Sequence, residues 1–212
     1  MGIRERKQRE YEKRKNLILD TARKMFHRKS FNGVTLDEIA HEIEFSKGTI
    51  YSHFESKEEI FAQILLEHLN RLIDYLKQAS ETSSGTEDGV RRALAAYLHF
   101  YDQHRDYCRL LFFVDILSDQ YRIPETLLQE ISRKKVACLS ELQRILSKSA
   151  KNAKNLALLL WGMINGILQL VESRQIKRSD LDRLVELGFE IVMSGLANRF
   201  TSPEGGESHG PF

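Results

Sequence analysis

Apolar residues recur every three or four positions along most of this chain, a spacing typical of amphipathic helices. Alternation of apolar and polar residues, the pattern of strands, is almost absent, and the 212 residues include only three prolines. The sequence therefore predicts an all-α protein. About nine helices are expected, over residues 14–28, 36–43, 47–51, 57–78, 89–103, 107–117, 124–147, 152–173 and 180–199.

Signals for helix starts are dense in the stretch TLDEIAHEIEFSKGTIYSHFESK. Thr35 and Glu38 form a capping box, in which the hydroxyl and the carboxylate each satisfy one backbone N–H at the start of a helix. Ser46 is the next candidate N-cap, and Ser56 with Glu59 forms a second capping box. These signals predict two short helices, a tight turn between them, and the start of a long third helix.

The second short helix has almost no core of its own. Only Ile50 and Phe54 are clearly apolar there, so one edge is expected to pack inward. The other face carries hydrogen-bond donors, at Lys47, Thr49, Tyr51, Ser52 and His53. A short helix with donors outward, held across a turn by another helix, is the pattern of a helix-turn-helix.

This stretch resembles the DNA-binding segment of TetR/AcrR-type transcriptional repressors over roughly residues 14–62. The similarity includes the apolar helix with EIA, then SKGTIY, HF and SKEE, in this order. One position differs, because the family usually has glycine at the turn, where the backbone tends to positive φ, and this chain has Glu44. A non-glycine residue in that conformation costs on the order of 1 kcal/mol.

The resemblance implies DNA contacts along the second short helix and at neighbouring helix starts. Lys47 is expected to reach a base edge, because lysine donates to guanine O6 and N7, and Gly48 lets the backbone come close to DNA. Tyr51 and His53 resemble family positions that hold phosphates, with packing of the small domain as the alternative. The expected DNA contacts are Thr35, Ser46, Lys47, Gly48, Thr49, Tyr51, Ser52, His53 and Lys57.

The charge distribution favours a basic head that meets phosphates. Residues 1–57 carry 13 Lys and Arg against nine Asp and Glu, a net charge of +4, whereas the remainder has a net charge of −2. Residues 1–13 form a charged arm or a fraying helix, which could lie along DNA phosphates or could be a disordered tail. Thr35 and Lys57 stand at helix starts, where backbone N–H groups favour phosphate oxygens.

The helix pattern divides the chain into three parts. Residues 1–57 are expected to form a three-helix DNA-binding domain, and residues 58–200 a larger helical domain for regulation and dimerisation. Residues 201–212 contain Pro, Gly and Ser without periodicity and are expected to be a flexible tail. The helix count and lengths match the TetR-type layout of three DNA-binding helices and about six in a regulatory body.

A single reading helix contacts only a few base pairs, so a homodimer on a pseudo-palindromic double-stranded operator is expected. The last two helices are the expected interface, because both are strongly apolar and carry glycines that allow close approach. The alternative is that these residues form core within one chain. The expected interface residues are Leu156, Leu160, Gly162, Met163, Gly166, Ile167, Leu184, Val185, Gly188, Val192 and Leu196.

Aromatic residues concentrate in the larger domain, beyond what a tight helical core needs. With a few polar groups they could line a cavity for a small apolar or aromatic ligand, and the resemblance favours a ligand that releases DNA. The alternatives are an ordinary core, and a DNA-binding activator or architectural protein without a ligand. The candidate pocket residues are Tyr97, Phe100, Tyr101, Cys108, Phe112, Trp161, Asn165 and Gln169.

Enzyme motifs are absent from the sequence: it has no HExxH, no Gly-rich phosphate loop and no GxSxG elbow, and its histidines are scattered. No enzymatic activity, cofactor or metal is therefore expected.

Cys108 and Cys138 lack a CxxC partner and are expected to be reduced packing residues. The N-terminus does not read as a signal peptide, and the apolar run 156–171 is short for a membrane span and contains Asn165 and Gln169. A cytoplasmic protein in which this run is a buried helix is expected.

Overall fold

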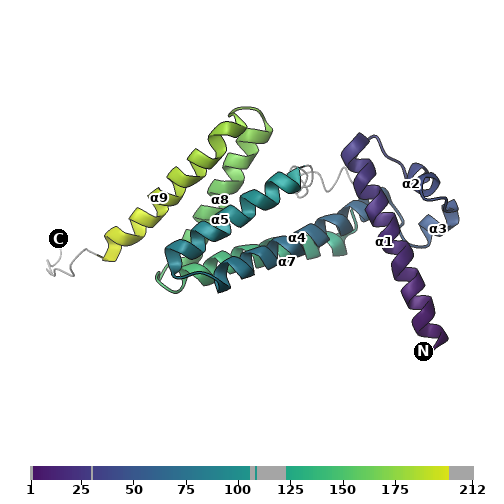
Figure 1. Cartoon of the computed structure of the whole chain (residues 1–212), viewed down its shortest axis with the longest axis horizontal. Helices are drawn as coiled ribbons and strands as arrows, with labels where there is room; N and C mark the ends of the chain where they lie inside the picture. The colour runs from purple at the N-terminus through teal and green to yellow at the C-terminus, as the bar shows by residue number, and fades with distance from the viewer. Residues whose placement is uncertain (1, 30, 106–107, 109–122, 201–212) are drawn as a thin grey trace, which may run out of the picture. The chain divides into compact units, whose positions relative to one another are not determined.

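The computed structural model describes residues 2–29, 31–105, 108 and 123–200, with side chains as far as Ser194. These residues form eight α helices and one short 3-10 helix, with no strand among them, so the all-α prediction is confirmed. The helix predicted at residues 107–117, apart from Cys108, and the tail predicted at 201–212 lie outside the described residues. The elements are α1 (Ile3–Lys29), α2 (Leu36–Glu42), α3 (Lys47–Tyr51), α4 (Lys57–Glu81), α5 (Thr86–Gln103), α7 (Glu125–Leu146), α8 (Ala153–Glu172), η1 (Arg178–Asp180) and α9 (Leu181–Phe200) (Figure 1).

The chain divides into two compact units, each assembled from separate stretches of sequence. The first unit contains Met1–Tyr75 and Leu98–Cys138, and the second contains Leu76–Tyr97 and Leu139–Phe212. The helices α4, α5 and α7 each contribute residues to both units. The domain boundary predicted after residue 57 falls at the start of α4, inside the first unit.

The first helix, α1, begins at Ile3, well before the start predicted at Arg14. Its first turns have no apolar stripe but are rich in Glu, Lys, Arg and Gln, which are good helix formers. Pairs one turn apart add support, because Gln8 Nε2 donates to Glu12 Oε1 at 2.9 Å and the Arg14 guanidinium lies 3.1 Å from Glu10 Oε1. The charged arm of the sequence is therefore a continuation of the helix.

The first three helices share a small core within the first unit. Its buried apolar members are Ile18, Leu19, Ala22, Met25, Phe26, Phe31, Val34, Ile39, Ala40, Ile50 and Phe54. The ring of Phe31 lies 5.3 Å from that of Phe26 and 5.1 Å from that of Phe61 on α4, measured between centroids. The first turns of α4 therefore belong to the same core as the three helices before them.

Polar contacts also fix α4 to α1 within this unit. The Arg23 guanidinium lies 2.6 Å from Glu67 Oε2. The next residue, His68, is 2% exposed, and its ring centroid lies 4.3 Å from that of His104. Burial, with smaller effects from His104 and two nearby arginines, lowers the pKa of His68 to about 3. His68 is therefore neutral at physiological pH, and its pairing with His104 was not predicted from the sequence.

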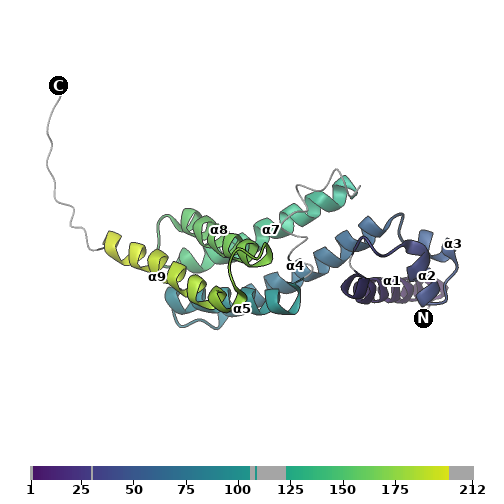
Figure 2. The same cartoon turned by 90° about the horizontal axis from the view of Figure 1, so that it is seen from above.

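In the second unit, α8 and α9 lie side by side (Figures 1 and 2). Gly188 on α9 permits this close approach, because a Cβ at that position would collide with Met163 Sδ on α8. The stripe of α8 that is buried within the chain consists of Ala153, Ala157, Leu160, Ile164, Leu168 and Val171.

The other side of α8 remains apolar and uncovered. Among the described helices, α8 is the one long and apolar enough to cross a membrane by length and composition, with a mean hydropathy of 1.3, but core helices pass the same test. The prediction that this helix is buried holds for one stripe only, since Leu158, Leu159 and Leu170 are 46%, 63% and 38% exposed. An apolar surface is therefore left outside the chain's own core.

The turn after α2 places Glu44 in the left-handed region of the backbone, with φ of 55°. The Phe45 N–H donates to the Ala40 carbonyl at 2.9 Å, and the Glu44 N–H donates to the His41 carbonyl at 3.2 Å. These are the two hydrogen bonds of a Schellman motif, which closes a helix around one left-handed residue. The positive φ expected at this position is confirmed, and the chain adopts it without glycine.

Replacing Glu44 with glycine is expected to raise the free energy of unfolding by roughly 0.5–1 kcal/mol. Glycine adopts a positive φ without the steric cost of a Cβ, although its greater freedom in the unfolded chain cancels part of the gain. Urea unfolding of the wild type and of Glu44→Gly, followed by circular dichroism, would measure the difference.

The matched control is Glu44→Ala, which removes the carboxylate but keeps the Cβ. This variant is expected to unfold at the same urea concentration as the wild type or a lower one. Equal stabilisation by alanine and glycine would show that the gain comes from removing a charge, and would contradict a strained backbone at this turn.

Candidate nucleic-acid interface

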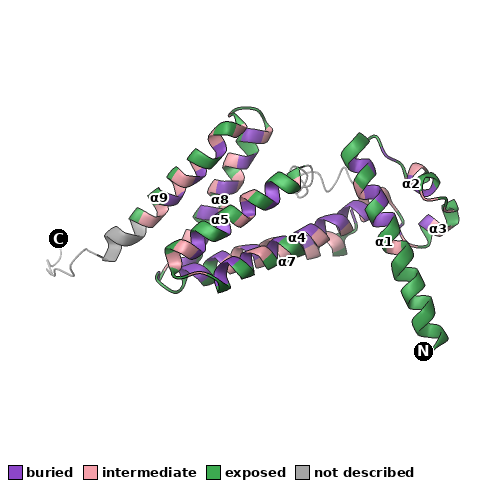
Figure 3. Ribbon diagram, in the orientation of Figure 1, coloured by how far each residue is buried: buried purple, intermediate pink, exposed green. Residues whose placement is uncertain are grey.

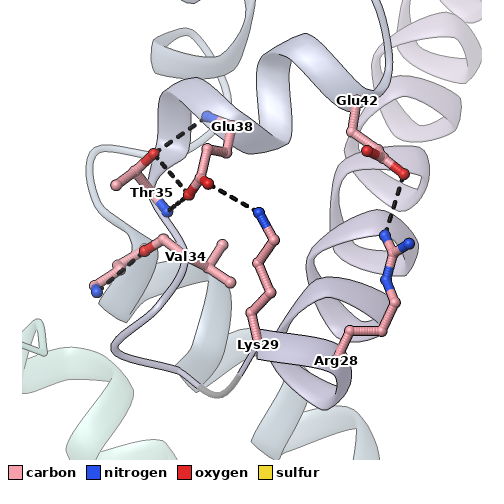
Figure 4. Close-up of polar contacts among 7 residues, drawn as sticks. Arg28, Lys29, Val34, Thr35, Glu38 and Glu42 are labelled. Atoms are coloured by element: carbon pink, nitrogen blue, oxygen red, sulfur yellow. Dashed lines mark hydrogen bonds and ion pairs between the residues drawn. The ribbon is translucent and has the colours of Figure 1, made fainter.

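The capping box at the start of α2 forms as predicted (Figure 4). The Glu38 N–H donates to Thr35 Oγ1 at 3.2 Å, and the Thr35 N–H donates to Glu38 Oε2 at 2.9 Å. The Lys29 ammonium donates to the other carboxylate oxygen, Glu38 Oε1, at 2.9 Å. Lys29 first, and then the Thr35 N–H, hold the pKa of Glu38 below its ordinary value. The Thr35 hydroxyl, an expected DNA contact, is thus already used inside the protein.

Lys57, another expected phosphate contact, points into the same region. Its ammonium donates to the carbonyls of Phe31 and Val34 at 3.2 and 3.1 Å, and lies 4.6 Å from the centroid of the Phe31 ring. An ammonium has three N–H donors, so one remains after these two hydrogen bonds. In this structure Lys57 ties the loop between α1 and α2 to the start of α4, and only its third donor is left for a phosphate.

The short helix α3 is fixed by its cap and by two buried side chains. Ser46 Oγ accepts from the Thr49 N–H at 3.1 Å, which confirms the predicted N-cap. Ile50 and Phe54 are 0% and 1% exposed, so they anchor the inner edge of α3 in the small core shared by the first three helices. The Ser52 hydroxyl donates to the Thr49 carbonyl at 2.7 Å and extends the helix end.

The outward edge of α3 faces solvent. Tyr51 is 55% exposed, and Lys47, Gly48 and Ser52 are also exposed, whereas Thr49 and His53 are half-buried. Lys47 is held at the edge of this surface, where its ammonium pairs with the Asp37 carboxylate of α2. That hydrogen bond raises the pKa of Lys47. The cation expected to read a base is therefore positioned by an exposed acid on the neighbouring helix.

Gly48 has no role in packing the protein. A Cβ at this position would meet only Ser46 Oγ, at 3.9 Å, and would otherwise point into open space. Helix interiors disfavour glycine relative to alanine by about 1 kcal/mol. Since the fold gives no reason for a glycine here, close approach of another molecule to the backbone of α3 is a physical reason that remains.

His53 follows α3 and packs under a residue that was not predicted to take part. The centroid of its ring lies 4.2 Å from that of Tyr11, on the N-terminal half of α1. Desolvation first, and then the charges of Arg14 and Lys15, lower the pKa of His53. The N-terminal half of α1 therefore passes directly beside the end of α3.

The candidate pocket residues fall in both units. In the second unit, the Tyr97 ring stacks on Trp161 with centroids 5.1 Å apart, and its hydroxyl donates to Asn165 Oδ1 at 2.7 Å. Asn165 Nδ2 donates in turn to the Trp161 carbonyl at 2.7 Å, while Gln169 is exposed. In the first unit, Phe100, Tyr101 and Cys108 are buried; Phe112 lies outside the described residues.

The expected interface residues differ in how far their own chain covers them. Leu160 and Val185 are buried within their own chain, and Met163 on α8 packs against Gly188 on α9 of the same molecule. Gly162 and Gly166 face open space, with nothing within 4 Å of a Cβ built on either. The half-buried members are Leu156, Ile167, Leu184 and Val192; the side chain of Leu196 is outside the described set.

The most exposed apolar residues of these helices were not predicted as interface. They are Leu158, Leu159 and Leu170 on α8, and Leu187 and Ile191 on α9. Leu159, Gly162, Gly166 and Leu170 follow one another at spacings of three and four residues, so they share one face of α8.

Comparison with known proteins points to the same segment. The sequence profile "Bacterial regulatory proteins, tetR family" matches residues 18–64, from the first buried residue of α1 into α4. The uncharacterized HTH-type transcriptional regulator YhgD of Bacillus subtilis is 32% identical, over 57% of this chain and 60% of its own length. The biofilm operon icaADBC HTH-type negative transcriptional regulator IcaR of Staphylococcus epidermidis is 30% identical, over 55% of this chain and 58% of its own length.

The matched regions thus span about three fifths of the length of these curated relatives. Solved structures extend the likeness to most of the chain at the level of the fold. A transcriptional regulator of the TetR/AcrR family from Thermobifida fusca superposes with a TM-score of 0.67 and 17% identity, over 86% of this chain and 98% of that one.

Proposed function

We propose that this chain is a regulatory protein of the TetR family, a cytoplasmic repressor that binds double-stranded operator DNA as a homodimer. The observation that carries this proposal is the outward edge of α3, where an exposed Lys47 stands beside a glycine that the fold does not need. Repression is supported by the relative IcaR, which is a negative regulator. The alternative is an activator or architectural protein that uses the same DNA-binding surface.

Two copies of the chain are proposed to dimerise through the uncovered face of α8 and α9, which would place two DNA-binding segments on one operator. Leu159 and Gly162 on α8 and Leu187 and Ile191 on α9 offer apolar, partly flat surface to a second copy. Two helices from each of two chains would form a four-helix bundle across a two-fold axis. Leu160 and Val185 are left out of this interface, because they are buried in their own chain.

We also propose a small apolar or aromatic ligand in the second unit, near Tyr97, Trp161 and Asn165. The support is that two stacked aromatic rings and one amide lie together here, the combination of groups that lines sites for such ligands. The continuous helix α4 starts at Lys57, in the core that it shares with α1, α2 and α3, and ends in the second unit. It is therefore the proposed element that would transmit ligand binding to the DNA-binding helices. A ligand shifts such an equilibrium only by its difference in affinity for the two states.

Gly48→Ala is expected to fold at least as stably as the wild type but to lose specific DNA affinity by tenfold or more. Alanine favours the helix by about 1 kcal/mol, whereas its Cβ occupies space that the DNA backbone needs. The operator would first be selected from random DNA with the wild type. Binding would then be measured by fluorescence anisotropy, and stability by thermal unfolding.

The matched control is Gly85→Ala, the same change at a position where nothing lies within 4 Å of the added Cβ. It is expected to leave DNA affinity unchanged. If Gly48→Ala bound the operator as tightly as the wild type, α3 would not enter the major groove of the DNA. A wild type that selects no sequence from random DNA would overturn the regulator proposal itself.

Leu159→Glu combined with Ile191→Glu is expected to convert the protein to a monomer in sedimentation velocity and to weaken operator binding at the same time. Stable interfaces bury about 1,200–2,000 Å² in total, and two charges in the apolar centre would remove much of that gain. Leu17→Glu, at a leucine that is 45% exposed on α1, is the control and should leave the dimer intact. A double variant that sediments as the wild type would exclude this face.

Ligand response can be followed with Trp161, which is the single tryptophan of the sequence. Apolar and aromatic compounds that change its fluorescence are expected to release the labelled operator over the same concentration range. A compound that saturates the fluorescence change and leaves DNA affinity unaltered would favour the alternative, a regulator without an inducer at this position.

A further inference from the structure

The N-terminal half of α1 extends beyond the part of the helix that packs into the core shared by the first three helices. Ile18 is the first buried residue of α1, and the residues before it from Ile3 are exposed, with Lys15 half-buried (Figure 3). The stretch Ile3–Leu17 has a length of about 22 Å at 1.5 Å per residue. We call this stretch the extension. It carries seven Lys and Arg against three Glu, a net charge of +4.

Tyr11 identifies the side of the extension that faces the end of α3, because the centroid of its ring lies 4.2 Å from that of His53. Helical periodicity of 100° per residue places four cations within about 60° of Tyr11, namely Arg4, Lys7, Arg14 and Lys15. The three glutamates lie about 100–120° from Tyr11, on the flanks of the helix. The side beside α3 is therefore a face of four cations around one tyrosine, which we call the basic face.

Electrostatics agree with this placement. Arg14 and Lys15 are close enough to His53 for their charges to lower its pKa, after the larger effect of desolvation. His53 is the residue that ends the outward edge of α3, next to the exposed Tyr51. The basic face is thus continuous with the surface that is proposed to meet DNA.

We propose that the basic face is a second DNA contact, which lies along the phosphate backbone flanking the base pairs read by α3. This inference rests on the proposed function. From Arg4 to Lys15 the face spans about 16 Å, which corresponds to about five base pairs at 3.4 Å each. Apart from Tyr11 it has cations and no apolar stripe, so a polyanion suits it better than an apolar partner.

The contact adds affinity without sequence preference. Side chains of Lys and Arg on phosphates fix position and carry no base information. Each phosphate neutralised contributes about 0.9 to the slope of log K against log salt. Two such contacts raise binding roughly thirtyfold at 0.15 M salt relative to a 1 M reference.

The test compares two double variants that remove the same charge from opposite sides of the extension. Arg4→Gln with Lys7→Gln removes two cations from the basic face, and Arg6→Gln with Lys13→Gln removes two from the opposite side. Glutamine is a good helix former, so α1 is kept, which circular dichroism verifies. Each full-length variant is titrated on the selected operator, with and without five flanking base pairs, across a salt series.

The expected result is that Arg4→Gln with Lys7→Gln lowers the salt slope by about 1.8 and weakens binding ten- to thirtyfold on every sequence tested. Arg6→Gln with Lys13→Gln is expected to change both quantities much less. Trimming the flanking base pairs should weaken the wild type and remove most of the difference between the two variants.

If the two double variants gave equal salt slopes, the basic face would not be a DNA contact. The proposed function would still stand if the wild type selected an operator and Gly48→Ala lost affinity for it. Sequence-selective losses for Arg4→Gln with Lys7→Gln would contradict a phosphate contact. A wild type without any preferred sequence would overturn both the basic face and the proposed function.

Discussion

The burial of Ile50 and Phe54 is the interaction on which the proposed DNA-reading surface depends. The α3 helix has five residues, too few for an isolated helix to be stable in water. Its position is set by these two buried side chains, by the Ser46 cap, and by the Schellman turn around Glu44. The outward edge can then consist of donors and a glycine, because none of those residues is needed to hold the helix.

Lys57 and Lys47 both have partners inside the protein, and the partners differ in what they allow. Lys57 is half-buried and uses two donors on backbone carbonyls, so it is mainly part of the scaffold. Lys47 pairs with Asp37 in a contact that is exposed on both sides. Exposed ion pairs contribute little to stability, so a base or phosphate can replace Asp37 at small cost. Under the proposed function, Asp37 holds the Lys47 ammonium beside α2 until DNA replaces it.

The caps and the turn of the DNA-binding segment and the inward edge of α3 could be predicted from the sequence, whereas the helical N-terminus and the outward face of α8 could not. The capping box of Thr35 and Glu38 and the positive φ of Glu44 depend on neighbours in the chain, and both are present. The N-terminal arm was expected at most to be a fraying helix and not a continuous one, because its stability comes from helix propensity and charge pairs and not from an apolar stripe. On α8 the run from Leu156 to Trp161 is entirely apolar, so periodicity could not decide that Leu160 faces the chain and Leu159 faces outward.

The contacts of α4 argue for a helix that moves together with the head. Lys57 binds the loop before α2, Phe61 packs with Phe31, and Arg23 pairs with Glu67. The pair with Glu67 is partly exposed and contributes at most about 1 kcal/mol, whereas the buried rings contribute more. A ligand that displaced the far end of α4 would therefore carry α1, α2 and α3 with it, since separating α4 from the head would expose this core.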